Sequence, residues 1–184
     1  MRYIICGTLA LVAAPLAFAQ DEIDYQYVDL AYVDNELGNI DYDGIGLRGS
    51  MPLNQDIYVA AELAVTSGDV PLVGDIDRSD LALGIGYHFP IYRNTDFVAQ
   101  VDYLNIDLDE LGDDDGVRLQ AGVRSKVAPE LELRGALQYV DVTDSDVGIN
   151  LGAQYHFGSQ WAAFVELNEG DEMSGYMIGA RYGF

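Results

Sequence analysis

The chain has 184 residues with 31 acids against nine bases, a formal net charge of −22 and a single cysteine, Cys6. Nucleic acid is excluded as a partner, because binding to phosphates needs a basic surface. A disulfide framework is excluded as well, because one cysteine cannot form an internal bridge.

Residues 1–19 are predicted to be a cleaved signal peptide. Arg2 supplies the positive start, residues 4–16 supply the apolar run, and Ala17-Phe18-Ala19 fits the pattern of a cleavage site. Cleavage before Gln20 leaves one exported domain, residues 20–184, with no cysteine. A small exported domain without disulfides needs another source of stability, and a closed hydrogen-bonded barrel supplies one.

The rest of the chain contains no apolar run of about 20 residues, so insertion into a membrane would have to use strands. Short segments in which apolar and polar residues alternate are separated by turn signals and indicate an all-β meander. An even number of strands places both chain ends on one side of a membrane. We predict ten strands, with eight as the alternative, at residues 23–33, 42–51, 57–66, 79–89, 96–106, 116–125, 131–142, 147–157, 161–168 and 174–184.

The predicted connections alternate in charge. Every second one is acidic, and together these five hold 17 of the 31 acids. Outer-membrane barrels have long extracellular loops and tight periplasmic turns, so we expect the acidic connections outside and both termini in the periplasm. The acidic connections are residues 34–41, 67–78, 107–115, 143–146 and 169–172.

Each predicted strand has one apolar face and one polar face. The first strand is the least regular, and we expect Val28, Leu30 and Tyr32 to face outward. Glycines recur on the polar face, where the lack of a side chain relieves crowding on a concave wall and permits curvature. Aromatic residues gather near both predicted interfaces. These features favour a closed antiparallel up-and-down transmembrane β-barrel over a soluble sandwich.

The polar face predicts a network of charges inside the barrel. Two arrangements remain open: the charges pair across the lumen and block it, or they lie along the wall and leave a narrow channel with an acidic, cation-enriching mouth. The network comprises Arg48, Glu62, Asp102, Arg118, Arg124, Glu132, Arg134, Glu166 and Arg181.

No catalytic site, cofactor site or strong metal site is predicted. Enzymatic outer-membrane barrels need a histidine beside an acid or serine at the outer rim, whereas His88 and His156 each precede a short turn at the opposite end. Residues 107–118 do not fit an EF-hand loop, because Leu111 and Arg118 occupy ligand positions. Weak cation candidates remain at Asp113, Asp114 and Asp115.

The mature chain resembles the small porin-like outer-membrane β-barrel proteins, a group that includes a branch known as the sulfation-dependent quorum factor. The resemblance rests on Tyr25-Gln26-Tyr27-Val28-Asp29, on residues 43–50, on Gly84-Ile85-Gly86-Tyr87, on Ala121-Gly122-Val123-Arg124 and on the terminal Phe184. These motifs report barrel geometry, so no signalling role is carried over. The resemblance implies that Tyr182 and Phe184 form an assembly signal read by the barrel-assembly machinery, with periplasmic chaperones as further partners.

We therefore expect a non-enzymatic component of the bacterial outer membrane, which the open arrangement of the lumen would make a narrow cation-preferring pore. The alternative is a surface interaction or adhesion protein that acts through its acidic loops. Contact with lipid is expected in both cases, and contact with anionic lipopolysaccharide would need divalent cations as a bridge.

Overall fold

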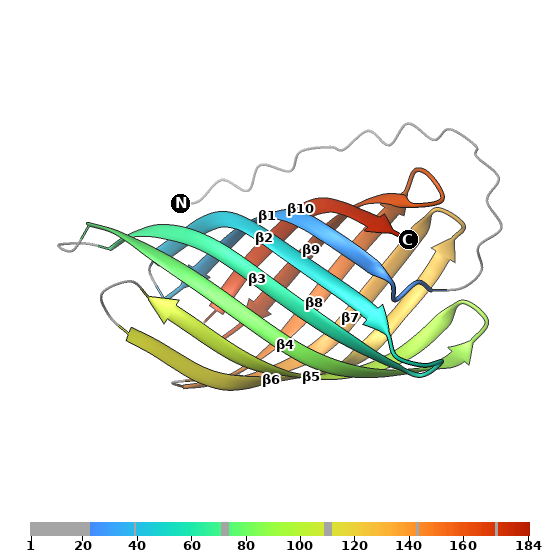
Figure 1. The fold of residues 1–184 in the computed structure, drawn as a ribbon, viewed down its shortest axis with the longest axis horizontal. Coiled ribbons are helices and arrows are strands. Elements are labelled where there is room, and N and C mark those ends of the chain that lie inside the picture. The colour runs from blue at the N-terminus through green and yellow to red at the C-terminus, as the bar shows by residue number, and fades with distance from the viewer. Residues whose placement is uncertain (1–22, 39, 71–73, 109–111, 143, 172) are drawn as a thin grey trace.

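The computed structural model describes residues 23–184 apart from 39, 71–73, 109–111, 143 and 172. The described chain forms ten strands, as predicted (Figure 1). None of the described residues forms a helix long and apolar enough to cross a membrane. The strands are β1 (Tyr27–Leu37), β2 (Ile40–Pro52), β3 (Ile57–Val70), β4 (Gly74–Tyr92), β5 (Thr95–Leu108), β6 (Gly112–Ala128), β7 (Leu131–Asp141), β8 (Ser145–His156), β9 (Trp161–Gly170) and β10 (Met173–Gly183).

The ten strands close into one barrel. Each strand pairs antiparallel with its neighbours in the sequence, and β1 pairs with β10 from Tyr27 opposite Gly183 to Leu37 opposite Met173. Closure leaves no sheet edge with unpaired backbone groups, which is the condition for a sheet to reside in lipid. The up-and-down barrel predicted from the alternating segments is confirmed.

Side chains alternate between lipid and lumen along every strand. In β1, Val28, Leu30 and Tyr32 are 42%, 59% and 43% exposed, whereas Asp29 is 1% exposed. The outward face of the first strand is therefore the one predicted. Large exposed apolar side chains form a belt around the outside, from Leu47 in β2 to Leu167 in β9, as a membrane-facing surface requires.

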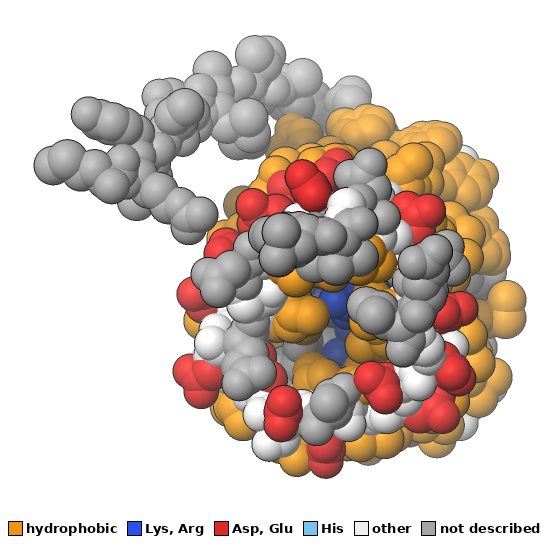
Figure 2. All heavy atoms as spheres, turned by 90° about the vertical axis from the view of Figure 1, so that its left-hand side faces the viewer, with side chains coloured by type: hydrophobic (Ala, Val, Ile, Leu, Met, Phe, Trp, Pro, Cys, Tyr) orange, Lys and Arg blue, Asp and Glu red, His pale blue; other side chains and the backbone are white. Residues whose placement is uncertain are grey.

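Two ends of the barrel can now be defined. The turn end carries the connections 53–56, 93–94, 129–130 and 157–160 together with Ile23 and Phe184, and the acidic end carries the other five connections. Figure 2 looks into the acidic end, where acidic side chains surround the mouth and basic ones lie deep within it.

The predicted long acidic loops are wrong for three connections. β1 and β2 remain paired up to Leu37 opposite Ile40, β3 and β4 up to Val70 opposite Gly74, and β5 and β6 up to Leu108 opposite Gly112. Beyond the apolar belt the outward positions of these hairpins carry acidic side chains such as Asp43, Asp77 and Asp113, so the apolar outward alternation that marks a membrane strand disappears while the backbone ladder continues. β4 and β6 reach 19 and 17 residues, against 10 in β9, and the rim is uneven. Gly74 and Gly112 have positive φ angles of 101° and 105°, which suit glycine where these strands begin.

The start of the first predicted strand is also wrong. The ladder begins at Tyr27, and residues 23–26 lie outside it with Ile23 and Tyr25 buried. Their side chains kept the alternating pattern, but they pack inside the barrel instead of pairing with a neighbouring strand.

Candidate functional site

Two carboxylates inside the barrel, Asp29 and Asp102, are the least exposed charged groups of the described chain, each 1% exposed. Asp29 points inward because it alternates in phase with Tyr27. Arg181 of β10 donates from Nε to its Oδ1 at 2.7 Å and from Nη2 to its Oδ2 at 2.8 Å. Arg48 of β2 donates from Nε to Oδ2 at 2.9 Å. Arginines from both neighbouring strands therefore hold Asp29.

Arg48 also reaches beyond its neighbouring strand. It donates from Nη1 and Nη2 to the two carboxylate oxygens of Glu166, at 3.0 and 2.7 Å. Glu166 lies on β9, and β1 and β10 stand between the two residues in the order of strands. Arg134 of β7 donates from Nη1 to the same carboxylate at 3.0 Å. We call Asp29, Arg48, Arg134, Glu166 and Arg181 the arginine layer.

Aromatic rings support the guanidinium groups of this layer. The Arg181 guanidinium lies 3.4 Å from the centre of the Tyr27 ring, and that of Arg48 lies 5.4 Å from the centre of the Phe164 ring. A cation over a ring face is attracted by the ring quadrupole, and a planar guanidinium stacks well there. The rings thus limit the orientations that the arginines can adopt.

A second charged group lies on the opposite wall. Arg118 of β6 donates from Nε to Asp102 at 2.8 Å, and its Nη2 lies 3.6 Å from Oε2 of Glu62. Gln100 donates to the other oxygen of Asp102 at 2.7 Å and accepts from the Tyr58 hydroxyl at 2.8 Å. Glu62 belongs to β3, so this group connects β3, β5 and β6.

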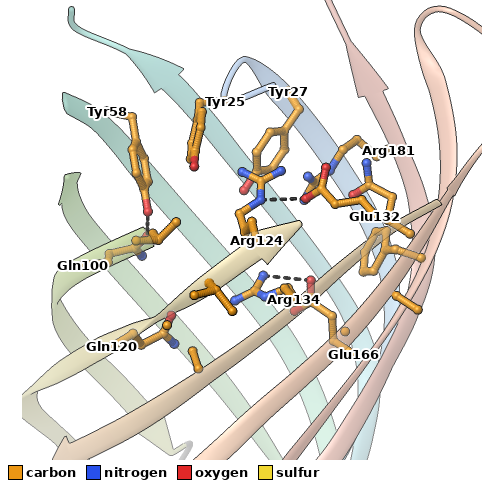
Figure 3. A pocket seen from close by; sticks show the side chains of 18 of the residues that line it. Tyr25, Tyr27, Tyr58, Gln100, Gln120, Arg124, Glu132, Arg134, Glu166 and Arg181 are labelled. Atoms are coloured by element: carbon orange, nitrogen blue, oxygen red, sulfur yellow. Dashed lines mark hydrogen bonds and ion pairs between the residues drawn. The ribbon is translucent and has the colours of Figure 1, made fainter. Parts of the chain in front are cut away.

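The remaining charges form pairs towards the two ends. Near the turn end, Arg124 donates from Nε to Glu132 at 2.7 Å (Figure 3). In the longer β4, Arg78 donates from Nε to Asp80 at 2.7 Å. The structure therefore places the nine predicted lumen charges in three groups: Arg48, Arg134, Glu166 and Arg181; Glu62, Asp102 and Arg118; Arg124 and Glu132.

The lumen contains two small cavities. The turn-side cavity has a volume of about 60 Å³ and is lined by Tyr25, Tyr58 and Arg134, among others. The acidic-side cavity has a volume of about 110 Å³ and is lined by Glu62, Arg118 and other residues. The two linings share no residue, and Asp29 and Asp102 are almost inaccessible to solvent. The side chains that pair with these two carboxylates therefore cover them and keep water away from them.

Almost all positive charge of the chain is inside the barrel. Of the nine bases, seven lie on the inward face, Arg93 lies in a turn, and Arg2 is outside the described residues. The seven are Arg48, Arg78, Arg118, Arg124, Lys126, Arg134 and Arg181.

Both histidines lie near the turn end. Nδ1 of His88 is 3.2 Å from Oδ2 of Asp96 without the geometry of a hydrogen bond, and Nε2 of His156 is 2.9 Å from the side-chain nitrogen of Gln154. Within the described ranges, no group of three or more histidine, cysteine or acidic side chains could hold a metal ion.

The weak cation candidates Asp113, Asp114 and Asp115 lie within β6, opposite Asp107, Ile106 and Asn105 of β5. Successive side chains of a strand point to opposite faces, so Asp114 is turned away from the other two. Asp115 accepts hydrogen bonds from the Tyr103 hydroxyl and from the Asn105 amide, the latter at 3.0 Å.

The predicted network omitted three residues that the structure places in the lumen pairs. Asp29 shared the inward phase of Tyr25 and Tyr27, which was the signal that could have identified it. Arg78 and Asp80 gave a weaker signal, because Arg78 was placed in a loop. In the structure Arg78 is 5% exposed and faces the lumen.

Tyr182 and Phe184, the predicted assembly signal, lie at the turn end. Tyr182 packs against Trp161 with ring centres 4.9 Å apart and accepts a hydrogen bond from Gln160 at 2.9 Å. Phe184 is 52% exposed, and its backbone N–H donates to Gln26 at 3.4 Å.

Several solved barrels share this fold. The KdgM porin in complex with disordered oligogalacturonate is 13% identical with a TM-score of 0.55, and the match covers 85% of this chain and 99% of that one. The NanC porin is 10% identical with a TM-score of 0.56, covering 85% and 100%. The β domain of the Bordetella autotransporter BrkA is 10% identical with a TM-score of 0.57, covering 86% and 98%.

Comparison with curated protein sequences gives no match. The family model of the outer membrane protein beta-barrel domain matches residues 4–157, most of the chain. The match extends through β8, agrees with the barrel fold described above, and supports a location in the outer membrane. The chain belongs to the family of the outer membrane protein beta-barrel domain.

Proposed function

We propose that this protein is a non-enzymatic, porin-like envelope component whose lumen is held closed by the arginine layer. The observation that carries the proposal is the bridge from Asp29 through Arg48 to Glu166, which spans three strand-to-strand steps of the barrel wall. A buried charge that loses its partner is costly, so each pair resists the separation that an open channel requires.

The porin-like assignment rests on family membership and on the fold shared with the KdgM and NanC porins. The oligogalacturonate bound by KdgM is a ligand of that protein, and at 13% identity the likeness extends to the fold alone. We therefore propose low passage of small ions and assign no solute.

The direction of any ion preference depends on two opposing features. The acidic end raises the local concentration of cations, which favours the predicted cation-preferring pore. The arginine layer itself holds three arginines against two carboxylates and opposes cation passage. We propose that the acidic mouth prefers cations and that the arginine layer is a barrier to them. Reversal potentials in a salt gradient measure the net ion preference.

Planar-bilayer recording of the refolded protein tests the closed lumen. Wild-type protein should show little or no discrete conductance. Arg48→Ser should raise conductance by about tenfold, because it removes the bridge while Asp29 keeps Arg181 and Glu166 keeps Arg134. Arg93→Ser, which removes a base in a turn, is the matched control and should leave the recording unchanged. Large wild-type steps that Arg48→Ser does not alter would overturn the proposal.

A surface interaction through the acidic end is the second candidate, favoured by the ring of exposed acids around that mouth (Figure 2). With divalent cations as a bridge, this ring could contact lipopolysaccharide, and the triple change Asp107→Asn, Asp113→Asn and Asp115→Asn should then weaken magnesium-dependent binding to lipopolysaccharide vesicles. Unchanged binding would remove this candidate.

The termini are proposed to face the periplasm, with the assembly machinery and chaperones as partners during export.

A further inference from the structure

Residues 23–26, which precede β1, turn into the lumen at the turn end. Ile23 and Tyr25 are 7% and 5% exposed, and they form one apolar cluster with Tyr58 of β3. Val98 of β5 packs against the same cluster. We call residues 23–26 the strap.

The strap crosses the mouth to reach walls that β1 does not adjoin. The Tyr25 hydroxyl donates to Oδ2 of Asp96 at 3.0 Å, and the Tyr25 ring stacks on His88 with centres 3.8 Å apart. Arg124 places its guanidinium 4.6 Å from the centre of the Tyr25 ring and donates from Nη2 to the carbonyl of Asp24 at 3.1 Å. These partners belong to β4, β5 and β6, whereas β1 adjoins only β2 and β10.

The strap also closes the turn-side cavity. Tyr25, Tyr58, Val98 and Arg124 all line that cavity, and none of them lines the acidic-side cavity. Figure 3 shows Tyr25 above Arg124, between Tyr27 and Tyr58. The arginine layer bounds the same cavity through Glu166, Arg134 and Arg181. The cavity is therefore enclosed between two separate barriers.

The strap is attached in a way that allows it to be released. It lies outside the sheet ladder, and its described attachments to the far wall are made by side chains and one arginine contact to a carbonyl. Releasing Tyr25 would break no strand pairing, unlike removal of any segment of a barrel strand. The exit on this side leads directly to the turn-end solvent.

We propose that the strap is a gate at the turn end, clamped by Tyr25 against His88, Asp96 and Arg124, that closes the lumen independently of the arginine layer. This inference rests on the closed barrel proposed above, but it concerns the other boundary of the turn-side cavity. The two barriers then lie in series. The rise in conductance expected for Arg48→Ser occurs while the strap is released, and adding Tyr25→Ala should raise the conductance further.

Cysteine reactivity in the refolded barrel tests the gate. The protein used is residues 20–184, which lacks Cys6, so each variant carries a single thiol. Ala136→Cys places it in the turn-side cavity, Ala64→Cys in the acidic-side cavity, and Ser159→Cys in an exposed turn. The probe is a thiol reagent carrying a trimethylammonium group. We expect Ala136→Cys to react at least tenfold more slowly than Ser159→Cys while the strap is intact.

Adding Tyr25→Ala should speed the Ala136→Cys reaction about tenfold and leave the reactions of Ala64→Cys and Ser159→Cys unchanged. Tyr25→Phe, which loses only the hydroxyl bond to Asp96, should give a smaller increase. Gel mobility without heating, which differs between folded and unfolded barrels, confirms that each variant is folded.

Equal reactivity of Ala136→Cys and Ser159→Cys with the strap intact would overturn the gate. A reaction rate of the Ala136→Cys thiol that stays the same after Tyr25→Ala is added would also overturn it. The outcome is separable from the conductance test. Failure of the proposed closed lumen shows as a large wild-type conductance that Arg48→Ser does not alter. Failure of the gate shows as a reaction rate of the Ala136→Cys thiol that Tyr25→Ala does not change.

Discussion

Asp29 and Arg181 join the first and last strands twice, once through the backbone and once through their side chains. They are opposed in the ladder between β1 and β10, and their side chains form two hydrogen bonds of 2.7 and 2.8 Å. A one-residue slip of either strand at this seam would turn its charged side chain towards lipid and separate the pair. The pair therefore favours one register at the closing seam.

Asp29→Asn should destabilise the folded barrel by about 3–5 kcal/mol, because it leaves Arg48 and Arg181 short of a buried counter-charge. Urea unfolding followed by gel mobility without heating measures the loss. Glu36→Gln, an acid-to-amide change nearer the acidic end of the same strand, is the control and should cost less than about 1 kcal/mol. Equal effects of the two changes would show that the seam pair is not special.

Glu166→Gln should cost more stability than Arg48→Gln. Glu166 is the only described partner of Arg134 in the layer and accepts two bonds from Arg48. Its neutralisation leaves Arg134 without a carboxylate and makes Asp29 the one described carboxylate shared by Arg48 and Arg181. Loss of Arg48 leaves each carboxylate with one arginine. We expect the free energy of unfolding to fall by about 3–5 kcal/mol for Glu166→Gln and by roughly half of that for Arg48→Gln in the same unfolding assay. The reverse order would contradict the layer described here.

Gly122 and Gly135 form a matched pair for testing the crowded inner wall. A Cβ at Gly122, on the lumen face of β6, would collide with the carbonyl oxygen of Gly135 and with the backbone of Ala136. A Cβ at Gly135, on the lipid face of β7, would meet nothing closer than 3.5 Å. Gly122→Ala should therefore destabilise by about 1–3 kcal/mol, while Gly135→Ala should be neutral or stabilising. Refolding yield and urea midpoints compare the two variants directly.

Deletion of Phe184 should impair assembly in cells more than it lowers the stability of barrel refolded in detergent. Phe184 is half exposed, and its backbone makes one long hydrogen bond of 3.4 Å to Gln26, so little folded-state energy depends on it. Phe157→Ala removes an aromatic residue of similar exposure at the same end and is the control. Folded protein in the outer-membrane fraction should fall for the deletion and stay near wild type for Phe157→Ala.

Much of the fold could be predicted because membrane strands have two chemically different faces. Leu47 and Arg48 illustrate the rule: one side chain is half exposed to lipid and the next is buried in the lumen. The rule fails where the outward face becomes polar. Asp69 and Asp77 are exposed outward residues above the belt, so the pairing of these segments was not visible and Arg78 was placed in a loop.

The pairing inside the lumen could be predicted only in part. Alternation identifies which charges face inward, but it cannot say that Arg48 reaches Glu166 or that Tyr25 stacks on His88, because these contacts cross strands that are distant in the ladder. Such contacts depend on barrel diameter and strand tilt, which a single sequence does not state. The choice between a blocked lumen and a narrow channel, which the sequence leaves undecided, depends on those distances.

Confinement of the lysine and arginine residues to the lumen also affects how susceptible the exposed end of the barrel is to proteases. Enzymes of the trypsin type cut after lysine or arginine, and in the described chain Arg93 is the one base in a turn rather than on the inward wall. The connections at the acidic end contain no lysine or arginine at all. If that end faces the surroundings, a digestive protease that reads basic residues meets a surface with no cleavage site.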